Sequence, residues 1–102
     1  MNNKALMRNA LEDAQRENHR DLSSAQAAAE RGDWVAVRHH LHRLNGTAQL
    51  LGAVRLHDLA AQLEQDLVDN KNSQGMLAKL LRMERLLDEL DNEAQRIVSD
   101  CD

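Results

Sequence analysis

The chain has 102 residues, no proline, a single aromatic side chain and a formal net charge of −4. This length suits one domain with one hydrophobic core, and its many Ala, Leu, Gln, Glu and Arg residues favour an all-α fold, because they enter a helix at little cost. With only Trp34 available for stacking and a negative net charge, a nucleic-acid partner is not expected. We therefore expect one all-α domain over residues 1–102.

Both ends of the sequence bear on where the protein acts. The first residues, Met1 to Lys4, lack the apolar run of a signal peptide, and no apolar stretch approaches the roughly 20 residues of a membrane span. The single cysteine, Cys101, can form no disulfide within the chain, which agrees with a reducing compartment. These features predict a cytoplasmic protein without direct membrane contact.

Apolar residues recur at spacings of three and four along the chain, which is the period of an amphipathic helix. The first helical segment runs from about Asn3 to Arg31, and its polar middle, residues 15–21, would tolerate a break or a frayed turn. Gly32 is suited to ending this helix and Asp33 to capping the next. The positions at this spacing are Met7, Leu11, Ala14, the polar Asn18, Leu22, Ala25 and Ala29 in the first segment, and Trp34, Val37, Leu41, Leu44, Ala48 and Leu51 in the second.

Two further helical segments follow a second stop signal, Gly52. The third segment ends in the polar run 69–73, whose short side chains favour a turn, and Ser73 would cap a fourth segment from about Gln74 to Val98. The apolar positions are Leu56, Leu59, Ala60, Leu63 and Leu67 in the third segment, and Leu80, Met83, Leu87, Leu90, Ala94 and Ile97 in the fourth.

Four amphipathic helices with short connections predict an antiparallel up-down-up-down four-helix bundle. A coiled-coil oligomer would show the same apolar spacing. The tight junctions at Gly32-Asp33 and Gly52-Ala53 let each helix fold back on its neighbour and bury the apolar stripe within one chain. We therefore expect a monomer.

His42 is expected to face solvent on the polar side of the second helix. At about 100° per residue, it lies roughly 120° from the centre of the stripe between Leu41 and Leu44. Glycine at position 46 costs about 1 kcal/mol relative to alanine. This gap admits another protein, or Gly46 is a tolerated neutral substitution or relieves packing against a neighbouring helix. The sector around His42 contains Val35, Arg38, His39, Asn45, Gly46 and Gln49.

Glu64 is the candidate partner of the His42 ring. An imidazole is a nucleophile through one nitrogen when the other nitrogen keeps its proton for an acceptor. His42 lies ten residues before Gly52 and Glu64 twelve after it, so the two stand level in an antiparallel hairpin. Whether both side chains lean to the same side depends on the handedness of the hairpin, and a merely solvated glutamate is the alternative.

Three parts of the sequence together resemble histidine-containing phosphotransfer (HPt) domains. They are the run from His42 to Ala53, the Gly32-Asp33-Trp34 junction and the pattern Leu56-x-x-Leu59-x-x-x-Leu63-Glu64. The resemblance implies that His42 is a phosphoacceptor, that Glu64 orients its ring, and that Gly46 clears room for a partner.

The resemblance also implies a phosphocarrier without kinase activity of its own and without a bound cofactor. Such a carrier takes a phosphoryl group from one receiver-domain aspartate and passes it to another, in a response regulator. The receiver supplies Mg²⁺ and the catalytic groups, and the carrier is often the last module of a hybrid sensor kinase. Asn45 departs from the family, which usually has lysine there; Arg38, or Arg43 next to His42, could supply the missing positive charge.

Three other interpretations compete with the phosphocarrier. His39 and His42 have the spacing for a shared zinc ion, but no clear third and fourth ligand accompanies them, so no metal site is expected. A helical adaptor would dock a partner through the same face without chemistry, and a substrate module of a chemotaxis-type kinase would be phosphorylated by a kinase domain. The remaining histidines are expected to be surface groups: His19, His40 and His57.

Overall fold

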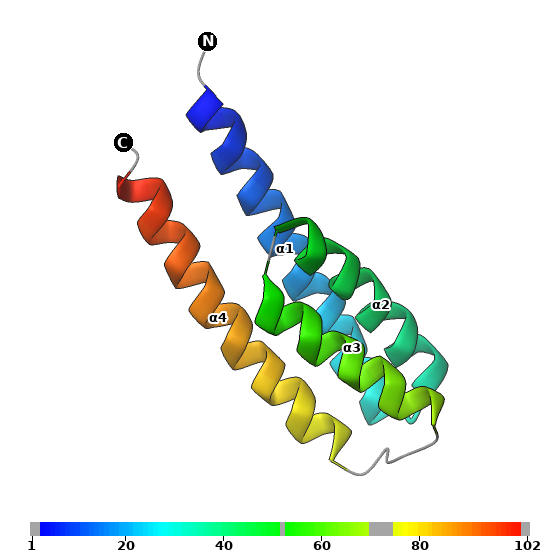
Figure 1. Ribbon diagram of the computed structural model, residues 1–102. Helices are drawn as coiled ribbons and strands as arrows, with labels where there is room; N and C mark the ends of the chain where they lie inside the picture. The colour runs from blue at the N-terminus through cyan, green and yellow to red at the C-terminus, as the bar shows by residue number, and fades with distance from the viewer. Residues whose placement is uncertain (1–2, 52, 70–74, 101–102) are drawn as a thin grey trace.

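The computed structural model describes residues 3–51, 53–69 and 75–100, with side chains as far as Arg96. Within these residues every regular element is an α-helix, which confirms the all-α fold class. Gly52, Ser73, Gln74 and Cys101 lie outside the described residues. The helices are α1 (Asn3–Glu30), α2 (Trp34–Leu51), α3 (Val54–Val68) and α4 (Met76–Asp100), shown in Figure 1.

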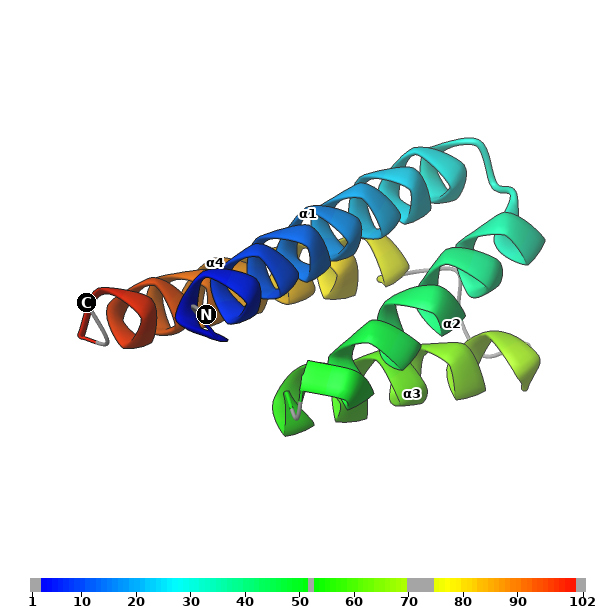
Figure 2. The ribbon, with the colours of Figure 1, turned by 90° about the horizontal axis from the view of Figure 1, so that it is seen from above.

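The helices form two pairs. Figure 2 shows α1 beside α4 and α2 beside α3, and further contacts join α1 to α2 and α3 to α4. The helices of the first pair are longer, with 28 and 25 residues against 18 and 15 in the second. The ends of α1 and α4 nearest the termini therefore project beyond α2 and α3 (Figure 1). None of the described helices is long and apolar enough to cross a bilayer.

The core consists of aliphatic and small side chains from all four helices, as the apolar spacing predicts. Two expected core positions are wrong: Met7 is 44% exposed and Leu51 38% exposed. Met7 lies in the part of α1 that extends beyond the shorter helices, and Leu51 is the last residue of α2. The largest fully buried side chains are Leu41, Leu44, Leu56, Leu63, Met76, Leu80, Met83, Leu87 and Val37.

The polar middle of α1 does not interrupt the helix, because its side chains make contacts with other helices. Asn18 and Asp21 are buried. An oxygen of Asp21 lies 3.6 Å from His40 Nδ1 and 3.5 Å from Arg43 Nε, both on α2. The Asp21 carboxylate lies between two side chains that can carry positive charge, and these contacts stabilise the helix where its polar sequence alone would favour fraying.

The three histidines expected at the surface are in fact partly buried. His19 on α1 forms a hydrogen bond through Nε2 with Asp91 Oδ2 on α4, at 2.5 Å. His40 faces Asp21, and the Nδ1 atom of His57 is buried. The helical spacing of a single segment does not reveal these positions, because each depends on a neighbouring helix.

The α1–α2 junction forms as expected from Gly32 and Asp33. Gly32 has a φ of 73°, in the left-handed region that glycine adopts without steric cost. Its N–H donates to the carbonyl of Ala29 at 3.0 Å, and the N–H of Asp33 donates to that of Ala28 at 2.9 Å, which is a Schellman motif. Asp33 Oδ1 then accepts a hydrogen bond from the Ala36 N–H at 3.2 Å and caps α2.

Candidate functional site

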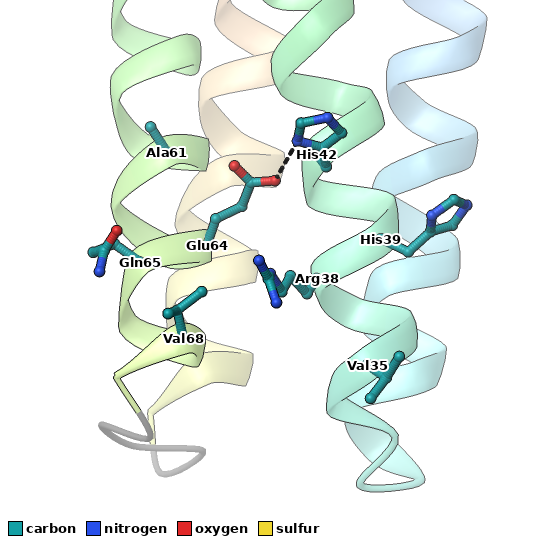
Figure 3. A pocket seen from close by; sticks show the side chains of 8 residues that line it. All are labelled: Val35, Arg38, His39, His42, Ala61, Glu64, Gln65 and Val68. Carbon is teal, nitrogen blue, oxygen red and sulfur yellow. Dashed lines mark hydrogen bonds and ion pairs between the residues drawn. The ribbon is translucent and has the colours of Figure 1, made fainter.

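His42 of α2 and Glu64 of α3 meet across the groove between their helices (Figure 3). His42 Nδ1 lies 3.1 Å from Glu64 Oε1, a hydrogen-bond distance. The histidine side chain is 80% exposed, whereas the glutamate side chain is only 18% exposed. The two side chains therefore lean to the same side of the hairpin, and a largely buried carboxylate contacts an imidazole that is open to solvent.

This contact determines which ring nitrogen can react. An ionised carboxylate only accepts hydrogen bonds, so Nδ1 carries the proton and donates it to Glu64 Oε1. In the neutral ring Nε2 then keeps its lone pair. Because the side chain is 80% exposed, a nucleophilic nitrogen is available to an electrophile carried by another molecule.

A groove of about 590 Å³ surrounds the pair. Figure 3 shows Arg38 extending from α2 toward α3, below Glu64. Val35 is 83% exposed and Val68 50% exposed, so each helix brings an apolar side chain to the site. The lining residues are Val35, Arg38, His39, His42, Ala61, Glu64, Gln65 and Val68.

The α3 members Ala61, Gln65 and Val68 were not anticipated from the sequence. Ala61 and Val68 lie three residues before and four after Glu64, so both share its helix face. Once Glu64 is taken as the partner of His42, this spacing is a usable signal. Without that assignment, nothing distinguishes them from other residues at the edge of the α3 apolar stripe.

The remaining residues predicted around His42 do not line the groove. Arg43 turns toward α1, where its Nε lies 3.5 Å from Asp21. Asn45 is half-buried, and its Oδ1 has no hydrogen-bond partner among the described residues. Gly46 and Gln49 are exposed farther along α2. Of the two arginines considered as substitutes for a lysine at position 45, only Arg38 lies in the groove with His42.

Gly46 is not required by packing within the chain. It lies inside α2, and a Cβ built at this position would meet no atom within 4 Å outside the local helix backbone. The alternative that Gly46 relieves contact with a neighbouring helix is therefore wrong. Gly46 weakens its own helix and relieves no clash with the described residues, so it leaves open space on the exposed face of α2, one turn after His42.

Gly46→Ala is expected to stabilise the fold by about 1 kcal/mol, because alanine favours a helix and meets no obstacle here. Urea unfolding followed by circular dichroism measures this change. Gly32→Ala is the matched control and should destabilise by about 1 kcal/mol, since the Gly32 φ of 73° is strained for a residue with a Cβ. A destabilised Gly46→Ala variant would show that packing does require this glycine.

Metal-ligating side chains gather elsewhere in the described part of the chain. The group of three that is close enough to share an ion is His19, Asp88 and Asp91, on α1 and α4. His39 and His42, the pair considered from the sequence, have no third ligand there.

The structure is thus a helical domain that presents an exposed histidine, hydrogen-bonded to a carboxylate of the neighbouring helix. The Hpt domain family matches residues 7–98, and the chain belongs to this family. Its members are phosphocarriers in two-component signal transduction. The resemblance to HPt domains, inferred from the sequence around His42, Gly46 and the Gly32 junction, is thereby confirmed.

Curated relatives are much longer than this chain. Sensor protein EvgS of Escherichia coli K12 is 33% identical over 92 residues, which is 90% of this chain and 8% of that protein. Virulence sensor protein BvgS is 36% identical over 64 residues in both Bordetella parapertussis and Bordetella bronchiseptica, covering 63% of this chain and 5% of each relative. No solved structure matches the chain significantly.

Proposed function

We propose that the chain is a phosphorelay carrier whose phosphoacceptor is Nε2 of His42. Nε2 attacks the phosphorus of an aspartyl phosphate on a receiver domain, the N–P bond forms, and the P–O bond to the aspartate breaks. A second receiver aspartate, in a response regulator, reverses these steps and takes the phosphoryl group. The hydrogen bond of 3.1 Å between His42 Nδ1 and Glu64 is the observation that carries the proposal.

Glu64 supports this reaction in two ways. Before transfer, it keeps the proton on Nδ1, so that the lone pair is on the nitrogen at the exposed edge of the ring. After transfer, a ring that is protonated at Nδ1 and phosphorylated at Nε2 carries a positive charge, and the Glu64 carboxylate stabilises it. The 18% exposure of the Glu64 side chain limits screening of this interaction by water.

The partner provides what the carrier lacks. The proposal assigns Mg²⁺ and the remaining catalytic groups to the receiver domain, and it assigns no kinase activity to this chain. It takes the bundle as antiparallel and up-down-up-down, acting as a monomer in the cytoplasm. The chain matches 8% of sensor protein EvgS, and we assign the receiver of a hybrid sensor kinase as a phosphoryl donor.

Arg38 is proposed to replace the lysine that the family usually carries at position 45. It lines the groove with His42 and makes no ion pair with the described residues, whereas Arg43 is engaged with Asp21. Arg38→Gln should slow transfer or shorten the phosphohistidine lifetime by about fivefold, the equivalent of about 1 kcal/mol for a partly solvated charge. Arg43→Gln should change both by less than about twofold. Equal effects in the two variants would contradict this assignment.

The proposed function is tested by incubating the purified chain with a panel of phosphorylated receiver domains and Mg²⁺. The expected product is a labelled chain whose phosphate is lost in acid and retained in alkali, as phosphohistidine chemistry requires. Label that survives acid would contradict the proposal. If receivers that exchange phosphate with other carriers give no label, the adaptor is favoured; label from a chemotaxis-type kinase domain with ATP would favour the substrate module.

A further inference from the structure

A second group of reactive side chains lies between α1 and α4. His19 of α1 contacts Asp91 of α4 through Nε2 and Oδ2, 2.5 Å apart. Asp88, one helical turn before Asp91, brings a second carboxylate to the same place, and one ligand atom from each residue lies within 4.8 Å of the other two. The phosphocarrier function uses none of these residues, since His42 lies between α2 and α3.

The chemistry of the group is that of a metal-ligand set. One imidazole and two carboxylates offer a nitrogen and two oxygens, which suits zinc and other divalent transition metals. Zn²⁺ binds such atoms at about 2.0–2.2 Å, so tetrahedral ligands lie about 3.4 Å apart. The ligand atoms of the three residues lie within 4.8 Å of one another, and His19 Nε2 and Asp91 Oδ2 are 2.5 Å apart, so changes of side-chain rotamer would bring the three to this spacing.

The burial and charge of the group also favour a cation. The side chains of His19 and Asp91 are 38% and 30% exposed, so the carboxylate is only partly hydrated. Asp88 is exposed and makes no ion pair with the described residues. The two carboxylates bring two negative charges together, no described lysine or arginine forms an ion pair with Asp88, and a divalent cation would balance these charges.

We propose that His19, Asp88 and Asp91 form a binding site for a divalent transition metal, with Zn²⁺ as the reference ion. The metal would take one ligand from α1 and two from α4, with water completing its coordination. It would join α1 to α4, the two long helices of the bundle. The site lies between α1 and α4, whereas His42 and Glu64 lie between α2 and α3, so the two sites share no residue.

The experiment is a calorimetric titration of the full chain with ZnCl₂, together with thermal unfolding in Zn²⁺ and in EDTA. Every protein carries Cys101→Ser, which removes the single thiol as a competing ligand. We expect one Zn²⁺ per chain and a rise in Tm of about 5 °C or more near saturation. Millimolar Mg²⁺ should leave this binding unchanged, because Mg²⁺ prefers oxygen ligands in an octahedral arrangement.

Asp88→Asn is the decisive variant, because it removes a ligand and breaks no contact among the described residues. In EDTA its Tm should equal that of the parent, and its Zn²⁺ affinity should fall about tenfold or more. His19→Gln should lose the site as well. His39→Gln, the matched control in the His42 groove, should bind Zn²⁺ as tightly as the parent.

Binding that persists unchanged in Asp88→Asn, or that disappears in His39→Gln, would overturn the metal site. So would the absence of any heat or Tm shift at Zn²⁺ concentrations about a hundredfold above the protein concentration. None of these readouts involves phosphoryl transfer. Failure of the metal site therefore leaves the proposed function untouched, and failure of phosphoryl transfer leaves the metal site untouched.

Discussion

Replacement of His42 by glutamine is expected to abolish phosphoryl acceptance and to leave the fold intact. An amide nitrogen has no available lone pair for attack on phosphorus, so no covalent intermediate can form at position 42. The His42 side chain is 80% exposed, while its neighbour Leu41 is buried, so the substitution removes the nucleophile without opening the core. Label transferred from a phosphorylated receiver measures acceptance, and urea unfolding measures stability.

His39→Gln is the matched control for this prediction. His39 lines the same groove three residues earlier, is exposed, and points away from α3 in Figure 3. It should retain acceptance within about twofold, as expected for a surface substitution with little structural effect. Label on the His42→Gln protein would place the phosphoacceptor elsewhere. Loss of receiver binding in that variant, measured by calorimetry, would mean that the ring is needed for docking as well as for chemistry.

Local signals in the sequence predicted the helices and the first junction. Gly32 and Asp33 form a cap whose hydrogen bonds all lie within a few residues, from Ala28 to Ala36, so the sequence contains everything the cap requires. The apolar spacing likewise identified Leu41, Leu44 and Leu63 as core residues. These features depend on short stretches of chain, which is why helical periodicity and cap chemistry were enough.

Features that depend on two helices were harder to predict. The polar middle of α1 suggested a break, yet Asp21 is buried against His40 and Arg43 of α2. The exposure of Met7 follows from α1 being longer than α2 and α3, a comparison that no single segment reveals. Both outcomes depend on helices that are distant in sequence.

At the site, too, some features could be predicted from the sequence and others depend on how two helices pack. Counting residues from Gly52 placed His42 and Glu64 at one level, and the structure brings them within 3.1 Å. The count could not give the handedness of the hairpin, which decides that Ala61 and Val68 join the groove. Arg43 is adjacent to His42 in sequence, yet it turns to Asp21, because successive residues of a helix point about 100° apart.

Leu63→Ala is expected to destabilise the fold by about 3 kcal/mol. Leu63 is 1% exposed in the core, and truncating a buried leucine loses its transfer free energy and leaves a cavity. For a domain of this size, the loss corresponds to a fall in Tm of about 12 °C or more. Urea and thermal unfolding measure it, and a change below about 1 kcal/mol would mean that the α3 core position collapses around the gap.

The neighbouring substitution Glu64→Ala should change stability little and slow phosphoryl transfer strongly. Glu64 lies at the edge of the core with one exposed partner, so its loss should change stability by less than about 1 kcal/mol. It leaves His42 Nδ1 without its acceptor. Phosphoryl transfer should slow about tenfold or more, by analogy with metal-binding histidines that lose the carboxylate orienting their ring. Leu63→Ala, assayed at a temperature where it stays folded, should transfer at the parent rate. A comparable loss of transfer in both variants would show that Glu64 acts through the packing of α3 rather than through the His42 ring.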